Sequence, residues 1–463
     1  MRVSIMAVCK LYLTLSWVQV DNETTAYRPQ LKQIRLNGIQ MHNQRFHPNK
    51  TLSHFTTLIA AMLVTLLNFS VVQAATMNIK AEFKPDPSNP LINKFVNKTP
   101  STGFCALYPS LCKPDDLFSL RTQIYFVNNA TIEANHTDPR QGAIFIVPTE
   151  WRDLVITNNQ SGEQETVQIR IKGFGSQYRV SPNNVVSLVT NGGPSVDTVT
   201  AHGRLWTVPW ITAPNNCVST NGSLLLNSTD YTFFWLTSSQ GSCEKQAKFD
   251  IPNFRYNYLD FAYELRTPNP LTMSTGNYTG VITYTIGPEK DFDMGDVMIP
   301  SDDSLTLNFS LDVQHDLKVD IPPGGDKVEL IPKGGWQQWL QKGRIPEKLS
   351  RDQTFLMSSS SRFKMQLACD RQIGDTCAIS NGSHEVPVDV LVSMPNGIAN
   401  DDNSAVSRKP LSVSTDLLFQ PTFYVEQKPS TLHFEIQKQY VEEMLTAQGK
   451  YSGNITIVWD SDI

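Results

Sequence analysis

The sequence lacks the motifs that mark several enzyme classes. It has no G-x-S-x-G elbow, no H-E-x-x-H motif and no phosphate-binding loop, and Gly173 and Gly175 lack the third glycine of a dinucleotide-binding fingerprint. After residue 74 there are only five histidines, no two of them at a metal-ligand spacing: His136, His202, His315, His384 and His433. We therefore expect no catalytic residues, no metal site and no cofactor.

Long apolar runs are also missing after residue 74, so we expect no direct membrane insertion. The one apolar stretch, residues 52–74, follows Arg45 and Lys50 and ends in Val72-Gln73-Ala74. A basic flank, a short apolar run and a small-x-small exit are the parts of a secretory signal peptide. A signal begins a protein, so residues 1–74 are interpreted as a mis-assigned start, with Met41 the true one, plus a signal peptide. The mature chain is predicted to start at Ala75 or Thr76.

Basic residues are scarce in the predicted mature chain. The whole sequence has 39 basic and 44 acidic residues, of which residues 1–74 hold 7 and 2. The remainder therefore has 32 basic and 42 acidic residues, a net charge of −10. Such a balance argues against nucleic acid and against anionic membranes as partners.

Cysteines are few but regularly spaced. Without Cys9, which lies in the segment predicted to be removed, six remain, and no C-x-x-C spacing suggests zinc or redox chemistry. They form three local couples with separations of 7, 26 and 8: Cys105 and Cys112, Cys217 and Cys243, Cys369 and Cys377. We expect each couple to form a disulfide, in an oxidising compartment.

The apolar pattern is that of an all-β protein. Val167, Ile169 and Ile171 alternate with polar residues, and a similar alternation runs from Leu305 to Val313. Helical periodicity is brief, at residues 336–340 and 439–445. About 389 residues of this kind suggest two β-sandwich domains in tandem.

An internal repeat sets the expected boundaries. Residues 259–287 align without gaps onto residues 432–460 at an offset of 173, and the motif Gly276-x-Tyr278-x-Gly280 matches Gly449-x-Tyr451-x-Gly453. Both sandwiches are thus expected to end in equivalent strands. This predicts an N-terminal domain over residues 75–288, an acidic linker over residues 289–303 and a C-terminal domain over residues 304–463.

The C-terminal strand is predicted to have an uncovered apolar edge. Apolar residues alternate along it almost to the last residue: Tyr451, Ile455, Ile457, Trp459 and Ile463, with Gly453 between them. An exposed edge of this kind invites pairing with a strand from another protein. An ordinary closing strand has the same pattern, so the sequence leaves both interpretations open.

Several segments resemble one family of pilus proteins. Gly449, followed by alternating apolar residues, resembles the C-terminal motif by which a periplasmic chaperone recognises pilus subunits. GKYSGNITI resembles the terminus of the class 5 chaperone–usher pilus-tip adhesins, the CblD-like pilus biogenesis initiators. The likeness continues in TEWRDL (149–154), IRIKGF (169–174), the segment 251–265, GNYTGVIT (276–283) and LDVQHDLKVDIPPGG (311–325).

This resemblance implies two immunoglobulin-like domains, the second an incomplete pilin domain without its seventh strand. The partners it implies are a periplasmic chaperone, an outer-membrane usher, the N-terminal extension of the major pilin, and a host-cell receptor, with glycan the default. It implies export through the periplasm to the pilus tip on the cell surface, where the subunit binds the receptor and initiates assembly. It places receptor binding on Arg152 and Arg266, although Thr267 stands where the family has a second basic residue. The strand-acceptor interface falls on Gly449, Tyr451, Gly453, Ile455, Ile457 and Trp459.

Three alternatives remain at this stage. The chain could be a structural pilus subunit or another secreted immunoglobulin-like tandem without a receptor site, or, with least support, a secreted hydrolase. The strand-like segment 77–83 discriminates between pilus subunits, because an internal subunit donates it whereas a tip subunit folds it into its own first domain.

The acidic runs 291–296 and 400–403 could bind calcium, but neither has the EF-hand spacing.

Overall fold

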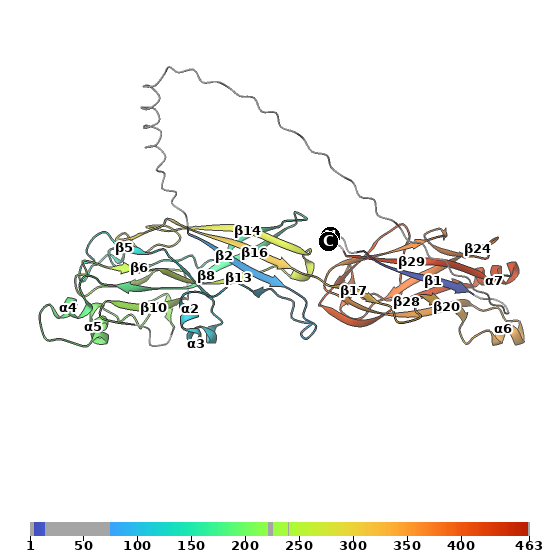
Figure 1. The fold of residues 1–463 in the computed structure, drawn as a ribbon, viewed down its shortest axis with the longest axis horizontal. Coiled ribbons are helices and arrows are strands. Elements are labelled where there is room, and N and C mark those ends of the chain that lie inside the picture. The colour runs from blue at the N-terminus through green and yellow to red at the C-terminus, as the bar shows by residue number, and fades with distance from the viewer. Residues whose placement is uncertain (1–3, 14–74, 221–225, 239, 462–463) are drawn as a thin grey trace, which may run out of the picture. The chain divides into compact units, whose positions relative to one another are not determined.

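The computed structural model describes residues 4–13, 75–220, 226–238 and 240–461. The predicted start at Met41, the signal peptide and the cleavage site at Ala74 lie outside these residues. The described chain is all-β, with two large sheets (Figure 1). Each sheet encloses a main hydrophobic core of its own. None of its helices has the length and apolar character needed to cross a bilayer.

The N-terminal sandwich is built around the 16-residue strand β8, Gln164–Arg179, which pairs with four others. Its core runs from Ile79 to Val313. Its strands are β2 (Ala75–Phe83), β3 (Val96–Asn97), β4 (Ser119–Thr122), β5 (Phe126–Asn128), β6 (Ala143–Phe145), β7 (Arg152–Asn158), β8, β9 (Cys217–Ser219), β10 (Asp230–Thr237), β11 (Cys243–Lys245), β12 (Arg255–Tyr256), β13 (Leu259–Arg266), β14 (Gly276–Thr285), β15 (Met298–Pro300) and β16 (Ser304–Val313).

The strand β16 closes the N-terminal sandwich. It pairs antiparallel with β14 over ten positions and parallel with β2 over nine. Its inward side chains are at most 2% exposed: Leu305, Leu307, Phe309, Leu311 and Val313. This strict alternation buries one face of the strand in the core and leaves the other toward solvent.

This placement corrects the predicted domain boundary. Residues 304–313 were assigned to the C-terminal domain, but β16 belongs to the N-terminal sheet, so the boundary follows Val313. Residues 289–303 are not a linker either. Phe292 and Met298 are fully buried, and β15 pairs with β5, because the apolar residues of this segment complete the N-terminal core.

The C-terminal sandwich has its own core, from Val328 to Trp459. Its strands are β17 (Leu317–Asp320), β18 (Lys327–Val328), β19 (Ile331–Pro332), β20 (Lys348–Ser359), β21 (Phe363–Cys369), β22 (Gln372–Ile373), β23 (Thr376–Ser380), β24 (Glu385–Ser393), β25 (Ile398–Asn400), β26 (Lys409–Pro410), β27 (Leu417–Pro421), β28 (Val425–Gln437) and β29 (Tyr451–Ser461). One further strand, β1 (Ser4–Leu13), joins this sheet from the other end of the sequence.

Helices are short and lie between strands. The N-terminal sandwich has α2 (Phe104–Leu107), α3 (Pro109–Cys112), α4 (Val185–Thr190) and α5 (Thr198–Leu205); the C-terminal one has α6 (Gln337–Lys342) and α7 (Lys438–Ala447). The described residues form three disulfides, and they are the pairs that the spacing predicts: Cys105–Cys112, Cys217–Cys243 and Cys369–Cys377.

Candidate functional site

The strand β29 is paired on both sides, and one of its neighbours is remote in sequence. On one side it pairs with β21 over seven positions. On the other it pairs antiparallel with β1 over ten, from Ser4 opposite Asp460 to Leu13 opposite Tyr451, as Figure 1 shows in dark blue beside red. β1 also runs parallel to β18. We call the place between β29 and β18, which β1 fills, the acceptor position.

The residues predicted to form a strand-acceptor interface lie on or just before β29. Four of them are 0% exposed and point into the C-terminal core: Tyr451, Ile455, Ile457 and Trp459. Strand parity places Gly453 on the same face, where an added Cβ would lie 3.0 Å from the carbonyl oxygen of Ala378. The structure therefore brings these predicted residues together as one inward face.

Gly449 has a different part in this arrangement. It follows the end of α7 and has a φ of 105°, a backbone conformation that residues with a Cβ rarely adopt. The glycine allows the chain to leave α7 and turn directly into β29. Its contribution is to the entry of the strand rather than to the apolar face.

The same place in the N-terminal sandwich is filled differently. There β14, the repeat equivalent of β29, pairs antiparallel with β16, and β16 runs parallel to β2. In the C-terminal sandwich β29 pairs antiparallel with β1, and β1 runs parallel to β18. The two patterns match strand for strand. The first sandwich supplies its closing strand from the residues that follow β14, whereas the second takes it from residues 4–13.

The segment that could have been a donor strand is part of the first sandwich. β2 contains residues 77–83, and its side chains Ile79 and Phe83 are at most 1% exposed. It is held by β16 on one side and β3 on the other. Residues 77–83 are thus paired within the N-terminal sandwich.

Arg152, at the start of β7, is held by an internal ion pair. Its Nη2 donates to Oδ1 of Asp291 at 2.5 Å, and its guanidinium lies 5.0 Å from the ring centre of Tyr284. Burial by itself raises the pKa of Asp291, but hydrogen bonds from Arg152 and Thr285 outweigh it, and the pKa lies below its ordinary value. The side chain of Arg152 is 37% exposed, so part of it remains accessible.

Arg266, at the end of β13, belongs to another cluster. Its guanidinium lies 4.1 Å from the ring centre of Trp151, and that of Arg170 lies 4.6 Å from the same ring. Arg170 and Lys172 both pair with Glu264. Within the described ranges Arg266 has no ion pair of its own, so it contributes an uncompensated, exposed positive charge beside an indole.

Register shows that Arg152 and Arg266 face opposite sides of the sheet. Arg152 lies opposite Ile169, which is fully buried, whereas Arg266 lies opposite Gln168, one position along β8. Neighbouring positions on a strand point to opposite faces. The two arginines therefore do not form one paired site.

Sequence reasoning missed the residues that accompany Arg266. Trp151 directly precedes Arg152, and Arg170 and Lys172 alternate with the buried Ile169 and Ile171. That alternation was the available signal, because charged residues between buried ones lie together on the outer face. The outer-face cluster is thus Trp151, Arg170, Lys172, Glu264 and Arg266.

A serine, a histidine and an aspartate are hydrogen-bonded in a row across three strands of the C-terminal sandwich. Nε2 of His433 lies 2.8 Å from Oγ of Ser393, and its Nδ1 lies 2.7 Å from Oδ1 of Asp352. The backbone N–H of Arg408 also donates to the Ser393 hydroxyl oxygen. Because Asp352 is 65% exposed and the hydroxyl oxygen is already engaged, we interpret the row as a cross-strand ladder that holds β20, β28 and β24.

Among the described residues, no group of three His, Cys, Asp or Glu side chains is placed to hold a metal ion. The acidic run 291–296 is engaged by arginines: Asp291 by Arg152, and Asp293 and Asp296 by Arg140. These ion pairs use the carboxylates that a calcium ion would need.

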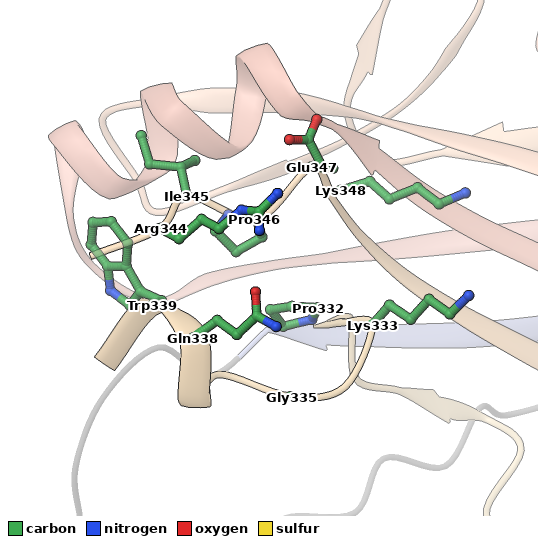
Figure 2. Close-up of a pocket in the computed structure, with 10 residues that line it drawn as sticks. All are labelled: Pro332, Lys333, Gly335, Gln338, Trp339, Arg344, Ile345, Pro346, Glu347 and Lys348. Atoms are coloured by element: carbon green, nitrogen blue, oxygen red, sulfur yellow. The ribbon is translucent and has the colours of Figure 1, made fainter. Parts of the chain in front are cut away.

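A cavity of about 300 Å³ lies beside α6 in the C-terminal sandwich (Figure 2). Pro332, Trp339, Ile345 and Pro346 supply its apolar surface. Its remaining lining is Lys333, Gly335, Gln338, Arg344, Glu347 and Lys348. Three cationic side chains and one carboxylate therefore surround it.

Comparison with known proteins gives structural likenesses at low identity. The adhesin CfaE of the CFA/I fimbria of enterotoxigenic Escherichia coli is 12% identical, with a TM-score of 0.24, over 83% of this chain and 92% of that one. A chain of the CsuC–CsuE chaperone–tip adhesion subunit complex of Acinetobacter baumannii is 10% identical, with a TM-score of 0.18, over 78% of this chain and 99% of that one. No family model and no curated protein matches the chain. Because these values are low, the function proposed below rests on the strand pairing of the chain itself.

Proposed function

We propose that this protein is the tip subunit of a chaperone–usher pilus, exported through the periplasm and displayed on the bacterial surface. The observation that carries the proposal is the acceptor position beside β29, which is filled from residues 4–13 and not from the C-terminal sandwich itself. Removal of residues 1–74 as a leader would vacate that position. A chaperone strand fills it first and the N-terminal extension of the next pilin replaces it.

The use of β2 supports a terminal place in the pilus. A subunit within the fibre both accepts a strand and donates one, whereas here residues 77–83 are paired within the N-terminal sandwich. The chain then accepts a strand without donating one. Such a subunit has no predecessor, which agrees with a role in initiating assembly at the usher and with exposure of its first domain to a receptor.

The receptor surface that we favour is the outer-face cluster around Trp151. Two guanidiniums held over one indole present charge-assisted donors close together on the outer face, which suit a glycan that carries carboxylates. The guanidinium of Arg152 is already hydrogen-bonded to Asp291, which leaves it fewer donors for a receptor. Of the two arginines predicted from the sequence, Arg266 is thus the better candidate for receptor binding.

The test of strand acceptance is co-expression of residues 75–463 in the periplasm with a pilus chaperone encoded beside this gene. We expect a soluble one-to-one complex that is lost in Ile457→Asp, because the carboxylate would be buried in the core. Thr456→Asp is the matched control, since Thr456 is half-buried on the opposite face of β29. A soluble, monomeric wild-type chain without any chaperone would argue for a complete sandwich and against a pilus subunit.

Receptor binding is tested separately, on assembled pili. Arg266→Ala should reduce adhesion to host cells while pilus number stays normal. The control is Arg204→Ala, since Arg204 is an exposed arginine on α5, and it should change neither adhesion nor pilus number. Unchanged adhesion in Arg266→Ala would remove the outer-face cluster from the receptor site and leave strand acceptance untouched.

A further inference from the structure

The cavity beside α6 lies at one end of the acceptor position. β1 runs antiparallel to β29 and its last pair is Leu13 with Tyr451, the first residue of β29. It runs parallel to β18, with Leu11 beside Val328. β18 ends at Val328, and Pro332 in the cavity wall follows it by four residues, in β19, which pairs with β20. A strand in the acceptor position therefore leaves it toward the cavity.

The charges of the cavity favour an anionic occupant. Lys348 is bound to Glu435 at 2.5 Å, and Glu347 lies 3.5 Å from Lys438, so these two charges are already compensated. Across the described part of the chain, Lys333 and Arg344 have no ion pair, and both are exposed. Two unpaired cations beside Trp339, in a mature chain of net charge −10, form a local positive site.

We propose that this cavity binds an acidic side chain of the strand that fills the acceptor position, two to four residues after the residue paired with Tyr451. The inference rests on the proposed function and adds a specificity determinant to it. At about 3.3 Å per residue, an extended strand that continues two to four residues past the partner of Tyr451 advances by about 7–13 Å. Pro332 in the cavity wall follows the end of β18 by four residues. Arg344 would bind the carboxylate, and Lys333 would add attraction.

Residues 4–13, which fill the acceptor position, contain no acidic residue. The sequence after Leu13 is Thr14-Leu15-Ser16-Trp17, and its first carboxylate is Asp21. Residues 4–13 pair with the backbone of β29, and among the described residues none forms an ion pair with Lys333 or Arg344. Among partner strands with the same apolar alternation, one with a correctly placed acidic residue would therefore be preferred.

The test uses synthetic peptides on the mature chain. Residues 75–463 are refolded with labelled peptides that contain residues 4–13, with Cys9→Ser, followed by either Thr-Leu-Ser-Trp, Thr-Leu-Glu-Trp or Thr-Leu-Lys-Trp, so that the charge lies three residues after the partner of Tyr451. We expect the acidic peptide to dissociate about tenfold more slowly than the neutral one, and the lysine peptide to dissociate faster. The variant Arg344→Glu should reverse the order of the acidic and lysine peptides and leave the neutral peptide unchanged.

A matched control and two contrary outcomes complete the design. Lys342→Glu, at the end of α6 and outside the cavity lining, should keep the preference for the acidic peptide. Equal dissociation of all three peptides would overturn the proposal while strand acceptance stands. If no peptide rescues refolding or binds, strand acceptance itself is wrong, and the cavity proposal is rejected with it.

Discussion

Tyr278 and Tyr451 occupy equivalent positions in the internal repeat, and both are fully buried, but the strand opposite each has a different origin. Tyr278 lies opposite Leu311 of β16, which belongs to the same sandwich. Tyr451 lies opposite Leu13 of β1, more than four hundred residues earlier in the sequence. The repeat therefore contains one sandwich that closes itself and one that is closed by a remote segment.

This difference predicts that the two sandwiches behave differently when separated. Residues 75–316 contain their closing strand and should be soluble, monomeric and cooperatively unfolded by urea. Residues 317–463 alone should aggregate, because the large apolar side chains beside the acceptor position, each worth about 1.5–3 kcal/mol when buried, would lose part of their cover. Size-exclusion chromatography of both fragments checks this, and a folded, monomeric 317–463 would contradict it.

Processing is expected between residues 74 and 75 or one residue later. The Val72-Gln73-Ala74 exit lies immediately before β2, whose first residue is Ala75. Cleavage there leaves β2 complete. N-terminal sequencing of the exported protein is the measurement, and recovery of any peptide from residues 1–40 in the exported chain would show that the leader assignment is wrong.

Arg152 and Arg266 should have separable effects. Arg152→Ala removes the hydrogen bond to Asp291 and the contact with Tyr284, so it should lower the free energy of unfolding of the N-terminal sandwich by about 1–2 kcal/mol. Arg266→Ala should change it by less than about 0.5 kcal/mol, because its side chain is exposed. Urea unfolding of residues 75–316 measures both. Equal losses in the two variants would refute the distinction.

The disulfides should differ in their contribution to stability. In the loop-entropy account, the stabilisation grows with the length of the closed loop, which is 26 residues in separation for Cys217–Cys243 and 7 for Cys105–Cys112. We expect the double replacement Cys217→Ser with Cys243→Ser to cost about 1 kcal/mol more than the equivalent change at Cys105 and Cys112. Chemical unfolding of the two double variants measures both losses in the free energy of unfolding. A larger loss at the shorter loop, Cys105–Cys112, would contradict the prediction.

The pH dependence of stability should report the pair of Asp230 with Arg179. Burial by itself raises the pKa of Asp230, but hydrogen bonds from Arg179 and Thr229 outweigh it, so the pKa of the folded state lies below 3.8. A carboxyl group with a lowered folded pKa stabilises fully above its unfolded pKa and loses that contribution as the pH falls through the folded value. Asp230→Asn should therefore cost about 1–3 kcal/mol at pH 7 and progressively less below about pH 4. A difference that stays constant from pH 7 to pH 3 would contradict this assignment.

The two arginines show how a local pattern can be right and still miss a spatial relationship. The resemblance assigns both to receptor binding, and the structure places Arg152 at the start of β7 and Arg266 at the end of β13. Whether they share a face depends on the register of β7 and β13 against β8, and a shift of one residue reverses the answer. Register is set by side-chain packing across strands, which the sequence of either segment does not contain.

The amino-acid sequence alone was sufficient for the all-β class, the repeat, the pairing of neighbouring cysteines and the inward residues of β29. These properties are local, because period-two alternation and short separations are read within a few residues. Only the tertiary structure assigned β16 and the acidic segment 289–303 to the first sandwich, and only it placed residues 4–13 beside β29. Alternation tells which side chains of a strand face inward, but the core that receives them is decided by pairing between strands that are distant in sequence.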